Sequence, residues 1–383
     1  MKISKNKIAA LIWSICLLFS LASCANNSQT KTREKVIKKS TGGLSLNKAT
    51  LEQSNNQGQP LWKIEVKQAN YSPDHKKVLI KDIKGNLFQD GKRILQIAAK
   101  EGEIYKNGEQ IYLKNNIVAV DPRNNITINA QQMRWQPKQD LLTITQRFSV
   151  NHLDLQLLAD QAQYHSRTQE LELTGKILGS SQGPYIKLQT EHLKWLVSQH
   201  KIIGDQMLEF IRYQDNSITD QLNTKKMEID TINKTILSQD TLSFKSINPS
   251  IQVSGNNFLW NYRERNLQSQ QPVQLYDYKQ QVTLTANQSD FDQNKKLAYL
   301  KGGVHGLSSR NKSEIYAQQA TWDIAAKKVD ASGSVIYKQI NPEMQLSGDQ
   351  AVGSLQTNQM VVTSQSGNKV VTQIYPKQKL SNN

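Results

Sequence analysis

The sequence contains few of the residues on which disulfide, thiol or metal chemistry depends. Only two cysteines occur among its 383 residues, Cys16 and Cys24, and both lie close to the N-terminus. A mature chain that began at Cys24 would have no disulfide and no thiol left for catalysis or metal binding. Cys24 would then serve to anchor the chain or have no role.

Motifs typical of enzymes are also scarce. The pentapeptide Gly179–Gly183 fits the G-x-S-x-G pattern of hydrolases, but that motif requires a strand-to-helix turn. Here a hairpin turn is expected, between a strand that ends at Ile177 and one that begins near Tyr185. No glycine loop ends in a phosphate-binding Lys-Ser/Thr, and the histidines show no ligand spacing. We therefore predict no enzyme, no cofactor and no metal site; the histidines are His75, His152, His165, His192, His200 and His305.

Proline and helical periodicity are likewise sparse. Nine prolines interrupt the chain, 37% of its residues are hydrophobic, and no helical period persists over a useful length. Ile, Val, Thr, Tyr and Trp are spread evenly and favour strands. Abundant Gln, Asn and Lys suit strands that have one face in water. The composition therefore predicts an all-β fold.

One long apolar run does occur, at the N-terminus. Three lysines precede an apolar stretch at 8–22, which is short for a membrane-spanning helix of about 20 residues. The stretch ends in LASC at 21–24, which is similar to the lipobox of bacterial lipoproteins. We therefore predict a lipoprotein-type signal peptide at 1–23 and lipidation of Cys24. An uncleaved signal anchor is the alternative.

The chain is strongly basic, with a formal net charge of +16. In an exported protein this charge favours a polyanionic partner, and anionic lipid head groups are closer at hand than nucleic acid. Alternatively, the lysines solubilise strand faces and protect the edges of sheets.

The segments AQQMRW at 130–135 and AQQATW at 317–322 indicate an internal repeat. In each, a small anchor residue has an aliphatic residue two positions before it, a small or apolar residue three after it, and an aromatic or apolar residue five after it. The pattern recurs, and the gaps between successive anchors are 33, 31, 29, 31, 34, 31, 31, 31 and 31 residues. Such a period is typical of repeat architectures. The anchors are Val66, Ala99, Ala130, Ala159, Thr190, Thr224, Gly255, Ala286, Ala317 and Gly348.

The second half of each repeat alternates with a period of two, as from Val329 to Tyr337, and this period indicates a strand. Short polar segments such as 323–328 suit hairpin turns, so each repeat predicts two strands in an antiparallel meander rather than a parallel β-helix. Up to the anchor, the apolar residues lie at even offsets from it, but after the anchor they lie at odd offsets. This change predicts a bulge or bend one or two residues after the anchor. The expected fold is an elongated antiparallel β-jellyroll, a twisted two-layer roll of about twenty strands.

The boundaries of the fold follow from the same pattern. Residues 24–57 are rich in Asn, Ser, Thr, Lys and Gly without a sustained period, which predicts a flexible tether. The unit around Thr224 has the longest gap and a very polar sequence, so it marks a possible seam. We therefore divide the roll into an N-terminal half at 58–217 and a C-terminal half at 218–376.

Two stretches carry a family resemblance. PLWKIEVKQANY at 60–71 and IYLKNNIVAVDPRNNITINAQQMRW at 111–135 resemble the OstA-like β-jellyroll family of lipopolysaccharide export, and within it the LptC family. The resemblance is sharpest from 60 to 178 and extends as a repeat pattern from about 58 to 375. The chain departs from the LptC pattern in being much longer and in having a lipobox in place of a transmembrane helix.

The resemblance implies a conduit for lipopolysaccharide. Members of the family accept it from the inner-membrane LptF/LptG ABC transporter, whose LptF component contributes a jellyroll. They hold the acyl chains between the sheets and pass the lipid on to an LptA-like or LptD jellyroll by end-to-end strand pairing. At about 0.8 kcal/mol per CH2 group, exposing several acyl chains to water would cost tens of kcal/mol. The implied location is the periplasm, with the lipid anchor in the inner membrane favoured and the outer membrane possible.

The resemblance also suggests roles for individual residues. The repeated aromatic residues would line an apolar trough, although ordinary core packing is the simpler explanation at any single position. The first and last strands would offer edges for docking, since exposed apolar edges invite strand pairing. The lining candidates are Trp135, Tyr164, Trp195, Trp260, Phe291 and Trp322. The docking-edge candidates are Trp62, Ile64, Val66, Val361, Val370 and Val371.

Two other functional classes remain open from the sequence. A surface or periplasmic β-solenoid lipoprotein could bind polysaccharide or partner proteins in a structural or adhesive role. A β-solenoid carbohydrate enzyme would need a carboxylate pair in a recurring acidic setting, and the sequence offers none.

Overall fold

The computed structural model describes residues 43–365 and 367–374, which belong to one compact unit, Gly42–Asn383. Within the described residues the chain forms thirty β-strands that belong to one antiparallel pairing network. The predicted all-β fold is therefore confirmed. The predicted signal peptide at 1–23 and the candidate lipidation site Cys24 lie outside the described residues.

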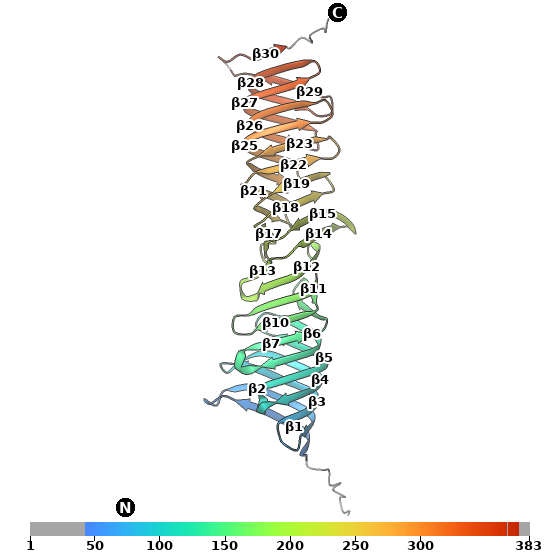
Figure 1. Ribbon diagram of the computed structural model, residues 1–383, viewed down its shortest axis with the longest axis vertical. Helices are drawn as coiled ribbons and strands as arrows, with labels where there is room; N and C mark the ends of the chain where they lie inside the picture. The colour runs from blue at the N-terminus through green and yellow to red at the C-terminus, as the bar shows by residue number, and fades with distance from the viewer. Residues whose placement is uncertain (1–42, 366, 375–383) are drawn as a thin grey trace, which may run out of the picture. The chain divides into compact units, whose positions relative to one another are not determined.

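Long strands make up the N-terminal part and pair in the order of the chain (Figure 1). Buried and exposed side chains alternate along them, as the period of two requires. The strands are β1 (Ser45–Ser54), β2 (Pro60–Tyr71), β3 (Lys77–Gln89), β4 (Lys92–Tyr105), β5 (Gln110–Asp121) and β6 (Ile126–Gln136). Among the residues that the structure describes, three 3-10 turns accompany the strands: η1 (Lys106–Gly108), η2 (Pro137–Gln139) and η3 (Val197–Gln199).

Beyond β6 the strands divide between two layers. The second half of β6 pairs with β7 and its first half with β8, so one long strand contributes to both layers. We call the layer that contains β7 layer A and the layer that contains β8 layer B. Layer A has the short strands β7 (Leu141–Thr145), β10 (Gln161–His165), β13 (Lys201–Gly204), β16 (Met227–Asp230), β17 (Thr235–Ser238), β20 (Phe258–Asn261), β21 (Asn266–Ser269), β24 (Gln288–Asp292) and β29 (Gln359–Thr363). Layer B has β8 (Phe148–His152), β9 (Leu155–Ala159), β14 (Leu208–Gln214), β15 (Ser217–Thr224), β18 (Leu242–Ser246), β19 (Ile251–Gly255), β22 (Val273–Asp277), β23 (Val282–Ala286) and β30 (Val371–Ile374).

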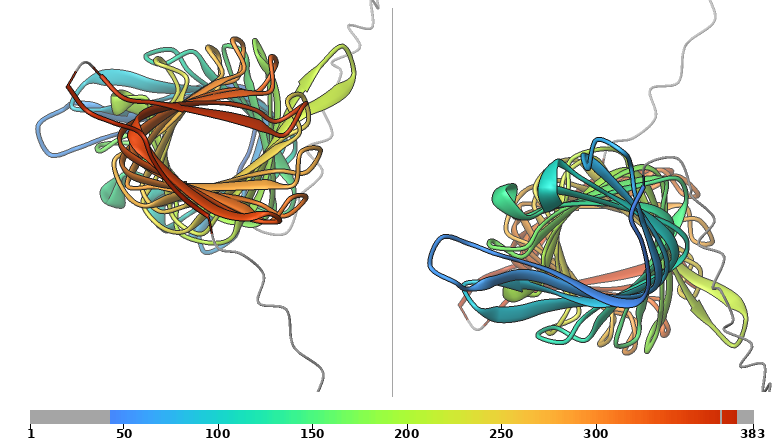
Figure 2. Two further views of the ribbon diagram at one scale, coloured as in Figure 1. Left: turned by 90° about the horizontal axis from the view of Figure 1, so that it is seen from above. Right: turned by 90° about the horizontal axis from the view of Figure 1, so that it is seen from below.

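Long bent strands join the layers again in the middle and near the C-terminus. The first half of β11 pairs with β10 in layer A, and its second half pairs with β9 in layer B. Seen along the stacking axis, the strands of the two layers surround a central space (Figure 2), which their inward side chains occupy. The remaining long strands are β11 (Glu170–Gln182), β12 (Tyr185–Leu196), β25 (Leu297–Ser308), β26 (Ser313–Asp323), β27 (Lys328–Ile340) and β28 (Glu343–Ser354).

The bend between the layers lies where the sequence predicts it. In β6 the register shifts just after the anchor Ala130, since Ala130 pairs with Ile117 but Gln132 pairs with Lys114. In the unit of Gly255 the strand ends at the anchor and the next strand begins at Phe258 in the other layer. The predicted bulge or bend one or two residues after the anchor is therefore confirmed. It also explains why there are thirty strands instead of about twenty, because between β7 and β24 the bend divides most of the long strands, other than β11 and β12, into two.

The repeat reappears in the hairpin turns opposite the bend. These turns form two rims, which we call rim A and rim B after their layers. Each rim A turn after β10 has one non-glycine residue in the left-handed region, with φ between 54° and 57°, and these residues follow one another at gaps of 31, 34, 31, 31, 31 and 31. A short polar turn accommodates such a residue at little cost. The residues are Gln169, His200, Lys234, Arg265, Lys296, Lys327 and Asn358.

The long gap of 34 residues has a local cause. The β14–β15 hairpin spans 17 residues from Leu208 to its partner Thr224, whereas the next hairpin spans 14 from Leu242 to its partner Gly255. The longer hairpin extends outward from the roll (yellow-green in Figure 2). The expected division between 217 and 218 falls near its tip, and strand pairing continues across it because β15 pairs with both β14 and β18.

The folded region begins earlier than the sequence pattern indicates. Strand β1 lies within the range 24–57 that we expect to be a tether, and it pairs along β2. A positive φ of 50° at Lys48 breaks the alternation, so that Leu46, Ala49 and Leu51 all lie opposite buried residues of β2. The tether prediction is therefore corrected for residues 45–54. The interrupted alternation is the reason that a strict period of two did not reveal this strand.

Candidate functional site

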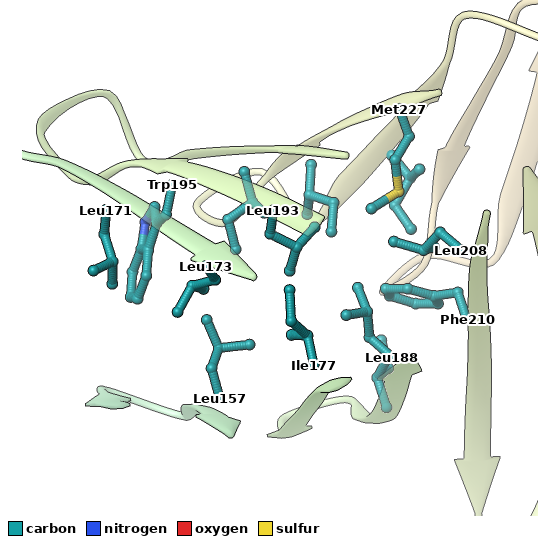
Figure 3. Packing of buried hydrophobic residues seen from close by; sticks show 14 of the residues in the cluster. Leu157, Leu171, Leu173, Ile177, Leu188, Leu193, Trp195, Leu208, Phe210 and Met227 are labelled. Carbon is teal, nitrogen blue, oxygen red and sulfur yellow. The ribbon is translucent and has the colours of Figure 1, made fainter. Parts of the chain in front are cut away.

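The interior between the two layers is one continuous apolar cluster. It extends from Trp62 on β2 to Ala351 on β28, and both layers contribute inward side chains to it. Figure 3 shows its middle part, where Leu157 of layer B lies opposite Leu173 of layer A. An apolar interior that runs through successive repeats is the most extensive feature that could hold a ligand.

Four tryptophans follow one another inside layer A. Trp135, Trp195, Trp260 and Trp322 are each at most 1% exposed, and each lies five residues after an anchor. They recur every second repeat, which corresponds to four strands or ~19 Å along the roll. Tyr164 and Phe291, which hold the same position in intervening repeats, are also buried. All six lining candidates thus face the interior.

The indole groups of these tryptophans are not all satisfied. Trp260 donates from Nε1 to Oε1 of Gln293 at 3.3 Å. In the part of the chain that the structure describes, Nε1 of Trp135, Trp195 and Trp322 has no hydrogen-bond partner. A buried donor without a partner costs free energy, so these three groups are available to an acceptor that enters the interior.

The series of inward aromatic residues, in which Tyr164 and Phe291 alternate with the tryptophans, has a gap at the unit of Thr224. Ile229 occupies the position five residues after that anchor. A cavity of about 70 Å³ lies at this level between the layers. Its apolar lining comes from both layers and includes Leu157, Leu188, Leu193, Ile202, Phe210 and Ile229. The smaller side chain of Ile229 explains the unfilled space, and the missing aromatic is the sequence signal that could have revealed it.

Polar contacts join rim A to rim B, and the strongest group surrounds Asp121 at the end of β5. Arg123 donates from Nη2 to Oδ2 of Asp121 at 2.7 Å, and the Tyr164 hydroxyl donates to the same oxygen at 2.8 Å. Burial alone would raise the pKa of Asp121, but the hydrogen bonds from Arg123 and Tyr164 outweigh it and hold the pKa below its usual value. Burial raises the pKa of Tyr164, and the carboxylate of Asp121 raises it further, so Tyr164 remains a hydrogen-bond donor.

A second cross-rim group surrounds Asp220 on β15, which is fully buried. Its Oδ1 accepts hydrogen bonds from Nε2 of Gln293 at 2.6 Å and from Nη2 of Arg265 at 3.1 Å, and both donors lie on rim A turns. Arg212 of layer B donates from Nε to the carbonyl of Tyr262 on rim A at 3.2 Å. These bonds fasten the rims next to Trp260.

Three further contacts cross between the rims. Near the N-terminal end, Trp62 donates from Nε1 to the carbonyl of Gly108 at 3.2 Å. Arg167 on rim A forms an ion pair with Asp90 on rim B at 2.9 Å. Lys234 on rim A forms an ion pair with Asp154 on rim B at 3.1 Å, beside the cavity. Sequence reasoning missed these residues because each pair is far apart in the chain and neither partner carries a local signal.

The two ends of the interior are only half covered. Leu46 and Leu51 of β1 are half-buried, as are Leu346 of β28 and Met360 and Val362 of β29, and the latter two pack against the cluster. In the middle of the roll, inward side chains are almost all buried. Among the described residues, the apolar side chains at both ends of the interior are thus partly exposed.

The N-terminal edge of the described sheet is β1, whereas the predicted docking-edge residues lie on the next strand, β2. Trp62, Ile64 and Val66 lie on β2, which pairs with β1 on one side and β3 on the other, and all three side chains are buried. The prediction for these three residues is corrected, since in the described part of the chain β1 is the outermost strand.

The C-terminal candidates lie on or next to strands with one described neighbour. Val361 belongs to β29 and Val371 to β30, and both strands pair with β28. Val370 directly precedes β30. Val361 is 60% exposed and Val371 53% exposed, so this edge presents β-branched apolar side chains to solvent.

The G-x-S-x-G segment lies on the second half of β11 and its hairpin to β12. The Ser181 hydroxyl donates to Oδ2 of Asp154 at 3.3 Å and to the carbonyl of Pro184 at 3.2 Å. A strand that continues into a hairpin does not form the strand-to-helix turn of a nucleophile elbow.

The comparison with protein families adds to this geometry. Residues 9–152 match the family described as "Lipopolysaccharide-assembly, LptC-related". This N-terminal part of the chain is LptC-related. A search of curated proteins found no match.

The LptC-related part includes strands β1 to β8, and the later repeats continue its pairing pattern. The family is associated with lipopolysaccharide transport and not with an enzymatic reaction. No helix among the described residues is long and apolar enough to cross a membrane. In the same part of the chain, no cluster of three or more His, Cys, Asp or Glu residues could hold a metal ion.

We expect Asp121→Asn to destabilise the roll, because it leaves Arg123 and Tyr164 without their buried carboxylate. The expected loss in the free energy of unfolding at neutral pH is about 3–5 kcal/mol, measured by chemical denaturation. The depressed pKa of Asp121 contributes stability above its unfolded pKa of about 4, and this contribution is lost as the pH falls through the folded pKa. In Asp121→Asn, the free energy of unfolding should therefore fall less steeply as the pH is lowered through the acid range.

The matched control for this variant is Asp330→Asn. Asp330 forms an exposed ion pair with Lys328 within one strand at 2.9 Å, so its loss should cost less than about 1 kcal/mol. If both variants lost the same free energy of unfolding, Asp121 would not be holding the two rims together.

Proposed function

We propose that this LptC-related protein carries lipopolysaccharide through the periplasm along its apolar interior. It accepts the lipid from the inner-membrane LptF/LptG ABC transporter and passes it toward the outer membrane. The observation that carries the proposal is the continuous apolar cluster between the layers, half-covered at both ends. A conduit needs such an interior because acyl chains cannot cross water unprotected at about 0.8 kcal/mol per CH2 group.

An acyl chain can pass only if the closely packed interior side chains move apart. The two layers are continuous through the backbone at the bend but are held at the rims by separate polar contacts, such as Arg167 with Asp90. The rims can therefore part locally while the bend stays closed. Acyl chains that enter would replace contacts between side chains with equivalent apolar contacts, and the unpaired indole groups of Trp135, Trp195 and Trp322 would meet their ester or amide carbonyls.

We expect a photocrosslinking residue at Trp260 to capture lipopolysaccharide in cells, because this position faces the interior. The matched control is Leu259, its neighbour on β20, which is 40% exposed on the outer face. The measurement is the amount of lipopolysaccharide adduct at each position, in full-length protein shown to be folded.

The alternative function, a surface lipoprotein that binds polysaccharide or partner proteins, gives the opposite result. It predicts adducts at outer positions such as Leu259 and none at Trp260. A folded protein without a lipopolysaccharide adduct at Trp260, Trp195 or Trp322 would overturn the conduit.

We propose that the two ends of the roll dock other jellyrolls by strand addition. The β1 edge would face the LptF jellyroll, and the edge formed by β29 and β30 would face an LptA-like or LptD jellyroll. Val361 and Val371 support this assignment, because exposed β-branched side chains on an outermost strand favour pairing and are normally avoided. Such pairing would extend both the sheets and the apolar interior.

The double variant Val361→Lys and Val371→Lys should weaken docking at the C-terminal end about fivefold to tenfold, since two cross-strand contacts are lost. The measurement is binding of the purified protein to an LptA-like or LptD jellyroll. Val352→Lys is the control, because Val352 is exposed but lies on β28, which already has neighbours on both sides. Equal weakening by the control would argue against edge pairing.

We also propose that acyl chains on Cys24 hold the protein at a membrane, with the inner membrane favoured. The lipobox-like sequence at 21–24 supports this anchor, and lasting attachment requires two or more acyl chains. Cys24→Ser should abolish labelling by a fatty-acid analogue and release the protein from the membrane fraction. Retention of the variant in that fraction would indicate an uncleaved signal anchor, and separation of the two membranes would distinguish inner from outer.

A further inference from the structure

The cavity beside Ile229 reaches both rims. Its lining runs from the core residues Phe210 and Ile229 to Asp154 of rim B and to Ile232 and Lys234 of rim A. It therefore lies beneath the contact between the β8–β9 turn and the β16–β17 turn. At this level the interior has a side opening as well as its two ends.

The lips of this opening are apolar, which is unusual for hairpin turns. Leu153 on rim B is 77% exposed and Ile232 on rim A is 55% exposed. Turns normally carry polar residues, and the corresponding rim A position in the next repeat is Arg263. An apolar surface thus extends from solvent at Leu153 and Ile232 into the aliphatic lining of the cavity.

One ion pair spans the opening. Nζ of Lys234 lies 3.1 Å from Oδ2 of Asp154, and Lys234 is only 12% exposed. The Ser181 hydroxyl supports Asp154 with a further hydrogen bond. On either side, the rims are closed by the buried carboxylates Asp121 and Asp220, which have several partners each. The Lys234–Asp154 contact is therefore the weakest closure between two strong ones.

The size and chemistry of the cavity indicate its occupant. About 70 Å³ is enough for only a few atoms, and a cavity with aliphatic walls favours an apolar guest over water. A slender acyl chain can extend the cavity by parting the rims and can continue into the apolar interior on either side. Beyond the two lip residues, the turns carry polar neighbours such as Asn233, which offer little area for a protein partner.

We propose that this opening is a lateral site where one acyl chain of an amphiphile enters or leaves the interior, with its head group held at the rim next to Lys234. The inference rests on the proposed function, because it assumes that the interior accepts acyl chains. It goes beyond that function in placing a gate in the side of the roll, at a repeat in the middle of the chain where Ile229 takes the place of the aromatic residue of the repeats on either side.

The test places a photocrosslinking residue at Leu153 or Ile232 of the full-length chain in cells. Met207 is the matched control, because it is 59% exposed but lies at the bend between β13 and β14, away from the rims. We expect lipid adducts at Leu153 and Ile232 and only background at Met207. A protein adduct in place of lipid at the lips would overturn the proposal in favour of a docking pocket.

A second variant, Ile229→Phe, gives this repeat the aromatic residue of the repeats on either side of it and fills the cavity. We expect it to reduce the lipid adducts at Leu153 and Ile232 to the level of Met207. Capture at Trp260 should be unchanged, since the variant makes this repeat resemble the others. Loss of the Trp260 adduct from the folded variant would mean that the cavity is a stage of the end-to-end path, which would overturn a separate side opening.

Charge variants test the gate itself. Asp154→Lys and Lys234→Asp both break the ion pair, but they leave opposite charges at the lip. For an anionic head group, Asp154→Lys leaves two lysines at the lip and Lys234→Asp leaves two aspartates. Lipid capture at Ile232 should therefore be at least about fivefold higher in Asp154→Lys than in Lys234→Asp, since a single exposed charge contact can already supply that factor. Equal capture by the two variants would overturn the role of Lys234.

The outcomes separate this inference from the proposed function. Lipopolysaccharide adducts at Trp260 without adducts at Leu153 or Ile232 would remove the side opening and leave the conduit intact. Adducts at none of these positions would remove both.

Discussion

The bend between the two layers is the constraint on which the rest of the structure depends. In each unit the chain crosses from one layer to the other one or two residues after the anchor, and this crossing reverses the parity of the side chains. Ala130 and Trp135 are an odd number of residues apart, yet both face the interior. A straight strand would turn one of them to water, and exposing a tryptophan of 150–250 Å² would forfeit about 4–6 kcal/mol. The same bend, repeated along the chain, places the apolar positions of all units in line.

The bend also makes the two sides of the roll unequal. On one side, every unit is held together by its own backbone. On the other side, closure depends on side chains such as Asp121 and Asp220, whose partners on the opposite rim lie 43 to 73 residues away in the chain. Buried carboxylates of this kind add little to stability when satisfied but are costly to leave unpaired. The roll is therefore closed by the backbone along the bend, whereas the rims can separate. Separation is easiest at the level of the cavity, where the single ion pair of Lys234 and Asp154 joins the rims.

The unit of Thr224 shows how a departure from the repeat changes the interior. Its hairpin is longer, its inward aromatic is replaced by Ile229, and its rim turn carries Ile232 where the next turn carries a polar residue. Each difference is small, but together they produce the cavity and its apolar lips. Departures from local rules in an otherwise regular protein are where function is expected.

The sequence by itself determined the repeat, the strand periodicity, the position of the bend and the inward direction of the tryptophans, because all four are expressed in residue spacings within one unit. It did not reveal β1, where the bulge at Lys48 interrupts the period, and it therefore placed the N-terminal edge at β2. Only the tertiary structure decided which rim residues meet, such as Lys234 and Asp154, which are 80 residues apart in sequence. Contacts across the rims depend on how the two layers face each other, and no local periodicity encodes that relation.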